Sequence, residues 1–219
     1  MVEHVIPSSF LIRRIELMFA VSYHAPARMS PITHFLMGWA VANTLPSLTK
    51  RERVFVTLAS VVPDVDGLGI IAEKLTQNSS HPLNWWTDYH HILGHNIGFA
   101  LLVAGLAAVF SKQKLMTSLL VFLSFHLHLI GDLVGARGPD GDQWPIPYLL
   151  PFSNHMRLTW SGQWALNAWP NMVITAALIA LSLILARTRG YSPLEMISAK
   201  ADASLVRVLR SRFPLKVTR

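Results

Sequence analysis

The chain has 219 residues, of which 52% are hydrophobic and only 14% are charged, and its mean hydropathy is +0.38. This composition is too apolar for an ordinary soluble domain and is typical of a small helical membrane protein. The absence of cysteine excludes disulfide bonds and thiolate metal sites. The formal charge of +7 is concentrated after Ala186, where eight Lys or Arg residues accompany two acidic residues, so it indicates membrane topology and contact with anionic lipid rather than nucleic-acid binding.

Residues 1–28 form an N-terminal extension with two open interpretations. Arg13 and Arg14 interrupt its apolar run, and it has no clear small-residue cleavage site, which argues against a signal peptide. The stretch fits an interfacial amphipathic helix. It also fits sequence upstream of a natural start at Met29.

Five apolar segments follow, and they predict an all-α fold, a small helical membrane protein with about four to five apolar helices. The segments are residues 31–45, 54–62, 96–110, 115–135 and 169–186. The last is just long enough to cross a bilayer, whereas the first two are short and fit half-buried or re-entrant segments.

The connections between these segments differ in character. We expect a charged loop at 50–53, a polar and aromatic interfacial linker at 73–89 and a long loop at 136–168. The chain then divides into the extension 1–28, a membrane-embedded domain 29–187 and a basic tail 188–219. In the tail, Leu194, Ile197, Ala201, Leu205 and Val208 fall at helical spacing, which predicts an amphipathic helix.

Two histidine-rich stretches, His90–His95 and His126–Asp132, predict a metal site. His128 and Asp132 are four residues apart, so a helix places them on one face. The spacing of five between His90 and His95 suits a loop residue and a first-turn residue, while His126 points elsewhere, as support or packing. Each could be an ordinary polar residue at a helix end, but ionisable groups at membrane depth are costly and usually functional.

The turn from Pro63 to Gly67 adds two carboxylates, Asp64 and Asp66. Two aspartates separated by one residue resemble a hard-metal or bridging-carboxylate corner. The alternative is a helix-terminating turn in which an aspartate only caps the backbone.

The basic stretches at 50–53, 112–114 and after residue 186 belong on the cytoplasmic side of a membrane. If the apolar segments alternate in direction, the candidate ligands and His155 all fall on the opposite face. The sequence therefore predicts a multi-pass protein with its metal site at one membrane face.

Four motifs, in this order, resemble the bacterial family of membrane-bound, metal-dependent hydrolases typified by the LexA-regulated inner-membrane protein YdjM. They are Thr33–His34, Pro63–Asp66, His90–His95 and His128–Asp132, followed by Pro151–Phe152. The resemblance covers roughly residues 29–187 and implies the bacterial inner membrane. Two departures, His91 in place of the usual Arg and Gly94 in place of Thr, bear on phosphate or substrate contacts.

That family is distantly similar to zinc-dependent phospholipase C, an all-helical enzyme that holds zinc ions with His and Asp. The similarity implies a helical bundle with metal between its helices and phosphoester hydrolysis as its reaction.

Together these observations predict a metal-dependent hydrolase that acts on a phosphoester or other lipid-like ester, with membrane lipids as partners and no nucleic acid. We expect two divalent ions, zinc first, with manganese or iron(II) as alternatives. The predicted ligands are His34, Asp64, Asp66, His90, His95, His128 and Asp132.

Other roles are assigned to residues near these ligands. Asp66 is also the candidate bridging ligand or general base, and His155 is a further ligand or acid. Arg157 and His91 are candidate substrate contacts, although Arg157 equally suits an interfacial anchor. Two other functions remain open: a divalent-metal transporter or sensor that uses the same ligands without turnover, and a structural membrane anchor that recruits partners through its basic tail.

Overall fold

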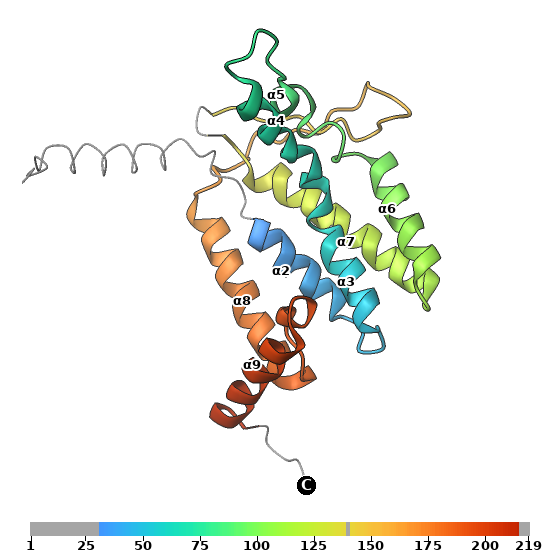
Figure 1. Ribbon diagram of the computed structural model, residues 1–219, viewed down its shortest axis with the longest axis vertical. Coiled ribbons are helices and arrows are strands. Elements are labelled where there is room, and N and C mark those ends of the chain that lie inside the picture. Colours follow the sequence, from blue (N-terminus) through green and yellow to red (C-terminus); the bar gives the residue numbers. More distant parts are fainter. Residues whose placement is uncertain (1–30, 139–140, 215–219) are drawn as a thin grey trace, which may run out of the picture.

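Helix α7, residues Lys114–Gly135, runs diagonally through the molecule and contacts α2, α3 and α6 (Figure 1). The structure is a computed structural model that describes residues 31–138 and 141–214. The predicted extension 1–28 and Met29 lie outside the described residues. The other elements are α2 (Pro31–Ala42), α3 (Lys50–Ala59), α4 (Gly69–Thr76), α5 (Trp85–Tyr89), α6 (Ile97–Phe110), α8 (Trp169–Arg189), α9 (Ala199–Arg212) and the 3-10 helices η1 (Val62–Leu68) and η2 (Pro193–Met196).

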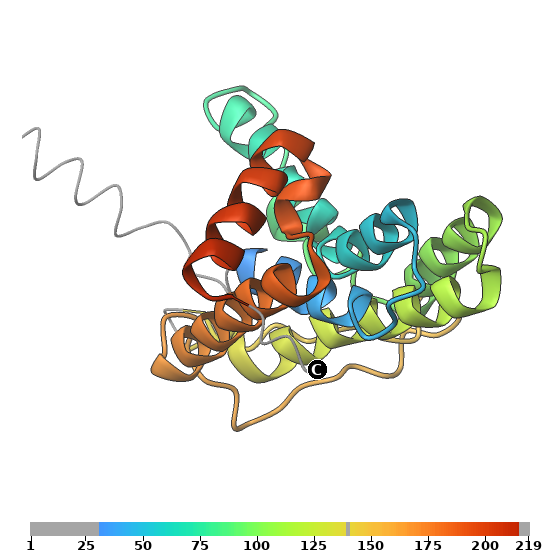
Figure 2. The ribbon, with the colours of Figure 1, turned by 90° about the horizontal axis from the view of Figure 1, so that it is seen from below.

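The predicted all-α fold is confirmed over the described residues, which form eight α-helices. Helices α6 and α8 occupy opposite flanks, with α2, α3 and α7 between them (Figures 1 and 2). Helices α4 and α5 and the loop 141–168 lie at one end of the bundle, and α9 lies at the other (Figure 1). Since α2 contacts α3, α7 and α8, it forms the centre of the bundle.

Small residues let these helices approach closely. Ala100, Ala104 and Ala107 recur at three- and four-residue spacing on α6, and all three are buried in the core shared with α7. Gly38 of α2 packs on Ser60 at the end of α3, where a Cβ atom would collide with the serine hydroxyl. The outer face of α6 carries exposed leucines instead, as expected for a helix in contact with lipid.

Helices α7 and α8 are long and apolar enough to cross a membrane, and they match the predicted segments 115–135 and 169–186. Helix α3 and the η1–α4 segment, which meet at a bend of 55°, provide a third candidate span if they are taken together. The 14 residues of α6 extend about 21 Å, which is less than the hydrocarbon core of a bilayer. Helix α2 is shorter still, with 12 residues.

Two expected connections are helical instead. The predicted charged loop at 50–53 is wrong, because these residues form the first turn of α3. Thr49 caps this turn, and Glu52 completes a capping box by accepting a hydrogen bond from the Thr49 backbone N–H at 2.8 Å. The expected linker 73–89 contains the end of α4 and all of α5, leaving only 77–84 as a connection.

A buried ion pair joins the basic tail to the bundle. The Arg53 guanidinium donates two hydrogen bonds to the Glu195 carboxylate, at 2.8 and 2.7 Å, and a third to the Leu48 carbonyl at 2.7 Å. The predicted tail helix is present as α9, but it turns Asp202 and Val206 inward. Ile197 and Val208 of the predicted apolar stripe are exposed.

We expect Glu195→Ala to lower the stability of the protein by about 3–5 kcal/mol, because it leaves the Arg53 guanidinium buried without its charge partner. Thermal unfolding of the detergent-purified protein measures this change. The Arg53→Met, Glu195→Leu double variant should recover most of the loss, since it removes both charges. Equal melting temperatures for wild type and Glu195→Ala would show that the pair does not anchor the tail.

Candidate metal centre

His128 lies in α7 with its ring fully buried and oriented by the end of α3. Its Nδ1 is 2.9 Å from the Ser60 carbonyl oxygen. A carbonyl oxygen only accepts, so Nδ1 carries the proton and Nε2 presents a lone pair. The Nε2 atom faces Asp132, one helical turn further along, with 2.9 Å between Nε2 and the Asp132 Oδ2.

His95 is oriented in the same way from the other side. It lies in the segment between α5 and α6, and its Nδ1 is 3.2 Å from the Asp66 Oδ2. When this nitrogen donates to the carboxylate, Nε2 of His95 is left as the acceptor. That atom lies 3.2 Å from Nε2 of His128. Two imidazole nitrogens therefore converge at one buried point, where either a proton or a metal ion must lie between them.

Two carboxylates complete the group. Asp132 Oδ2 is 3.3 Å from His95 Nε2, and Asp64 Oδ1 lies 3.8 and 3.7 Å from the Nε2 atoms of His95 and His128. Four ligand atoms bound tetrahedrally at the usual zinc distances are about 3.3–3.6 Å apart. The four atoms here all lie within 4.8 Å of one another, so the residues present fit a divalent ion.

The buried carboxylate of Asp132 supports this conclusion. Within residues 31–138 and 141–214, its Oδ2 atom receives no hydrogen bond. Burial by itself would lower the pKa of His95, but the neighbouring carboxylates of Asp132 and Asp66 raise it to about 9. The site thus favours a positive charge, which a proton on His95 or a metal ion can supply.

Asp66 orients His95 through its carboxylate and is not itself one of the four grouped residues. Its Oδ1 is 2.8 Å from His90 Nδ1, and its Oδ2 accepts a hydrogen bond from the Gly94 backbone N–H at 2.9 Å in addition to that from His95. A Cβ atom at Gly94 would collide with the Pro63 carbonyl, so the absence of a side chain lets this segment approach η1. Carboxylates that hold a ligand histidine in this way fix its tautomer and orientation.

His34 contacts the group from the first turn of α2. Its ring centroid is 4.0 Å from that of His128, and its Nε2 is 3.3 Å from the Asp132 Oδ1. The His34 carbonyl accepts a hydrogen bond from the Ser60 hydroxyl at 2.6 Å, so Ser60, which follows the last residue of α3, contacts both histidines.

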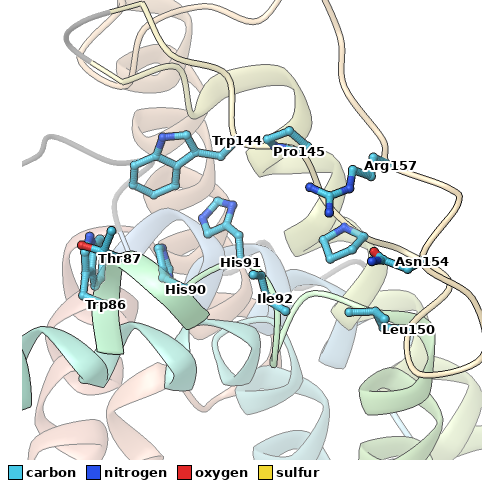
Figure 3. A pocket seen from close by; sticks show the side chains of 11 residues that line it. Trp86, Thr87, His90, His91, Ile92, Trp144, Pro145, Leu150, Asn154 and Arg157 are labelled. Atoms are coloured by element: carbon cyan, nitrogen blue, oxygen red, sulfur yellow. The ribbon is translucent and has the colours of Figure 1, made fainter. Parts of the chain in front are cut away.

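A cavity of about 460 Å³ lies beside this group, and His91 forms part of its wall (Figure 3). The His91 ring stacks on that of His95 at 4.3 Å, so a single ring separates the cavity from a candidate ligand. Figure 3 shows Trp86 and Thr87 on one side of His91, with Asn154 and Arg157 on the other. His91 has φ = 65°, a conformation that costs a non-glycine residue roughly 1–3 kcal/mol and is frequent at functional sites.

The structure thus brings Asp64, His95, His128 and Asp132 into one ligand group. His34 and Asp66 touch this group, and His90 reaches it through Asp66. The cavity takes in His91 and Arg157, whereas His155 is exposed and lies outside both the group and the cavity lining. The assignment of seven ligands and two ions remains a prediction.

Sequence reasoning missed several residues of the site. Ser60 acts mainly through its backbone carbonyl, for which side-chain chemistry gives no signal. Trp144 and Asn154 lie in the predicted loop 136–168. They line the cavity because the fold brings this loop to it, which no local sequence pattern indicates.

His126 is a packing residue, since Nδ1 donates to the Phe122 carbonyl and Nε2 accepts from the Tyr148 hydroxyl.

Comparison with known proteins identifies the family. The family model described as YdjM inner membrane protein matches residues 29–205. The chain belongs to the YdjM inner membrane protein family. No curated protein and no solved structure matches it. The YdjM match continues beyond α8 into α9, in agreement with the ion pair that holds the tail to the bundle.

We expect Asp66→Asn to weaken metal binding by about 10- to 100-fold, as is usual when the carboxylate behind a ligand histidine is lost. Competition titration of the purified protein with a chelator of known affinity measures the change. Asp88→Asn, at an exposed aspartate of α5, is the matched control and should bind metal as the wild type does. Equal affinities for all three proteins would exclude this role for Asp66.

Proposed function

We propose that this YdjM family protein is a membrane-bound, metal-dependent hydrolase of phosphoesters. One observation supports the proposal above the others: two buried histidines bring their Nε2 atoms within 3.2 Å of each other beside two carboxylates. Such a group is costly to bury without a cation and is typical of hydrolytic metal sites.

Asp64, His95, His128 and Asp132 would hold one divalent ion, with zinc, manganese and iron(II) all compatible with these ligands. A second ion would use His34 and the Oδ1 atom of Asp132, which lie 3.3 Å apart. A metal bound here would supply Lewis acidity and a hydroxide nucleophile at neutral pH. Asp64 is the most exposed of the four, with 24% of its side chain accessible. Water and substrate would therefore reach the site from the side on which Asp64 lies.

The other residues would bind and orient the substrate. Within the described part of the chain, Arg157 forms no ion pair, so its guanidinium is available for an anionic group in the cavity. His91 Nδ1 is buried and has no hydrogen-bond partner among the described residues. Burial, followed by repulsion from His95, lowers the pKa of His91 well below its ordinary value, so this ring would contact the substrate in its neutral form.

Asp66 and His155 take different places in this proposal. Both carboxylate oxygens of Asp66 are already hydrogen-bonded, so we assign it the positioning of His90 and His95 rather than proton transfer. His155 is exposed on the loop that carries Arg157 and remains the proposed acid. Its replacement by alanine tests that role, with an expected loss in kcat of about 100-fold.

Metal content is the first test of the metal site. Elemental analysis of the wild type purified in detergent should give at least one equivalent of zinc, manganese or iron, and two equivalents if His34 and Asp132 hold a second ion. The His128→Ala, Asp132→Ala double variant should lose the metal because it removes two ligands. His81→Ala, at an exposed histidine, is the control. A metal-free wild type after reloading with each ion would exclude the site.

Turnover separates the hydrolase from a transporter or sensor. The metal-loaded protein should release product from phosphodiesters, and the double variant should not. A protein that binds metal, hydrolyses no phosphoester and carries the ion into sealed vesicles would instead be a transporter, which would reverse our conclusion.

We expect Arg157→Ala to raise KM for an anionic phosphodiester by about tenfold, with a smaller effect on kcat, because it removes one charge-assisted contact. Steady-state kinetics in detergent micelles measure both constants. Arg207→Ala, at an exposed arginine of α9, should leave them unchanged. An unaltered KM in Arg157→Ala would leave Arg157 as an interfacial anchor.

A further inference from the structure

A second cavity of about 440 Å³ adjoins the cavity beside the metal centre. The two share Ile92 and Leu150, which therefore form the wall between them. The first cavity contains His91, Asn154 and Arg157, whereas the second is lined almost entirely by apolar residues. We call the second cavity the apolar groove; besides the two shared residues, it is lined by Leu93, Asn96, Gly98, Phe99, Leu102, Pro151 and Phe152.

The apolar groove has fixed walls. The backbone N–H groups of Ile97 and Gly98, in the first turn of α6, donate to the carbonyls of Tyr148 and Leu150 at 2.8 and 3.0 Å. These bonds satisfy two of the donors that a helix start leaves free, and they attach the loop to the helix. A Cβ atom at Gly98 would collide with Pro151, so the loop lies directly on α6.

The apolar groove opens outward on a surface suited to lipid. Three of its lining residues are largely exposed: Leu93 at 58%, Leu102 at 54% and Phe152 at 74%. Leu106 and Val109 continue this surface along α6, and both are also exposed. In a family of inner membrane proteins, such a continuous apolar face is expected to contact acyl chains.

We propose that the substrate is a membrane lipid with a phosphate-containing headgroup, with one acyl chain in the apolar groove and the headgroup against His91, Asn154 and Arg157. This inference rests on the proposed function, because it identifies the substrate class of the same site. A water-soluble phosphoester would use only the first cavity and would leave an exposed apolar groove beside it without a role. A lipid fills both cavities, with its chain on the side that faces the bilayer and its charge beside the metal centre.

Photolabelling tests the apolar groove without any need for turnover. The full chain is placed in nanodiscs of phosphatidylcholine that contain phosphatidic acid with a photoactivatable group on one chain, and the labelled peptides are mapped by mass spectrometry. We expect labels on residues 92–102 and 150–152. Leu102→Trp should lower labelling there by about tenfold, since the larger side chain fills the groove.

Leu101→Trp is the matched control, because Leu101 is the neighbouring residue of α6, is 51% exposed and lies outside the groove lining. It should label as the wild type does. Labelling that is spread evenly over α6 and α8 and is the same in both variants would overturn the proposal, since it would reflect general contact with the bilayer.

The headgroup has its own test. Arg157→Ala should weaken labelling by phosphatidic acid but not by a diacylglycerol probe, which carries the same chains and no phosphate. Excess inorganic phosphate or bis(para-nitrophenyl) phosphate should compete with phosphatidic acid if the first cavity binds the headgroup. Labelling by phosphatidic acid that neither Arg157→Ala nor either competitor reduces would overturn the headgroup assignment.

These outcomes are separable from those of the proposed function. A wild type that is labelled in the apolar groove but hydrolyses no phosphoester would end the hydrolase proposal and retain the lipid site. A wild type that hydrolyses soluble phosphodiesters but is not labelled in the groove would retain the hydrolase and end the lipid proposal.

Discussion

The close approach of the Nε2 atoms of His95 and His128 is the constraint on which the rest of the site depends. Each histidine donates from Nδ1 to an oxygen outside the group, Ser60 O or Asp66 Oδ2, and so directs its other nitrogen to one point. Two lone pairs and two carboxylates at a buried point repel one another unless a cation joins them. The bundle must therefore hold α3, α7 and the segment before α6 in fixed relation, and a cation bound there would offset the cost of burying these groups.

The features that hold these elements in place are mostly unrelated to metal binding. Gly38 lets α2 approach the end of α3, so that Ser60 can reach both His34 and His128. The three buried alanines of α6 bring that helix close to α7. At the far end of the bundle, the pair between Arg53 and Glu195 ties the tail to α3. The position of the ligand atoms thus depends on packing over the length of the bundle.

The loop 141–168 gives the site its chemical surroundings. It lies across the first turn of α6 and contributes Trp144, Asn154 and Arg157 to the cavity on one side and Pro151 and Phe152 to the apolar groove on the other. A single connection therefore provides a polar surface near the candidate metal centre and an apolar surface beside α6. The polar cavity and the apolar groove adjoin each other, as the charged and apolar parts of a phospholipid do.

The sequence by itself determined the helical class, the two long spans and the pairing of His128 with Asp132, because each follows from a periodicity within one segment. It also contained the capping box at Thr49, although the charge of residues 50–53 suggested a loop. Only the tertiary structure separated Asp64, which faces the metal position, from Asp66, which supports His95. Two aspartates in one turn look alike in sequence, and their roles depend on which side of the turn another segment approaches. That approach is set by contacts between residues far apart in the chain, which local pattern does not encode.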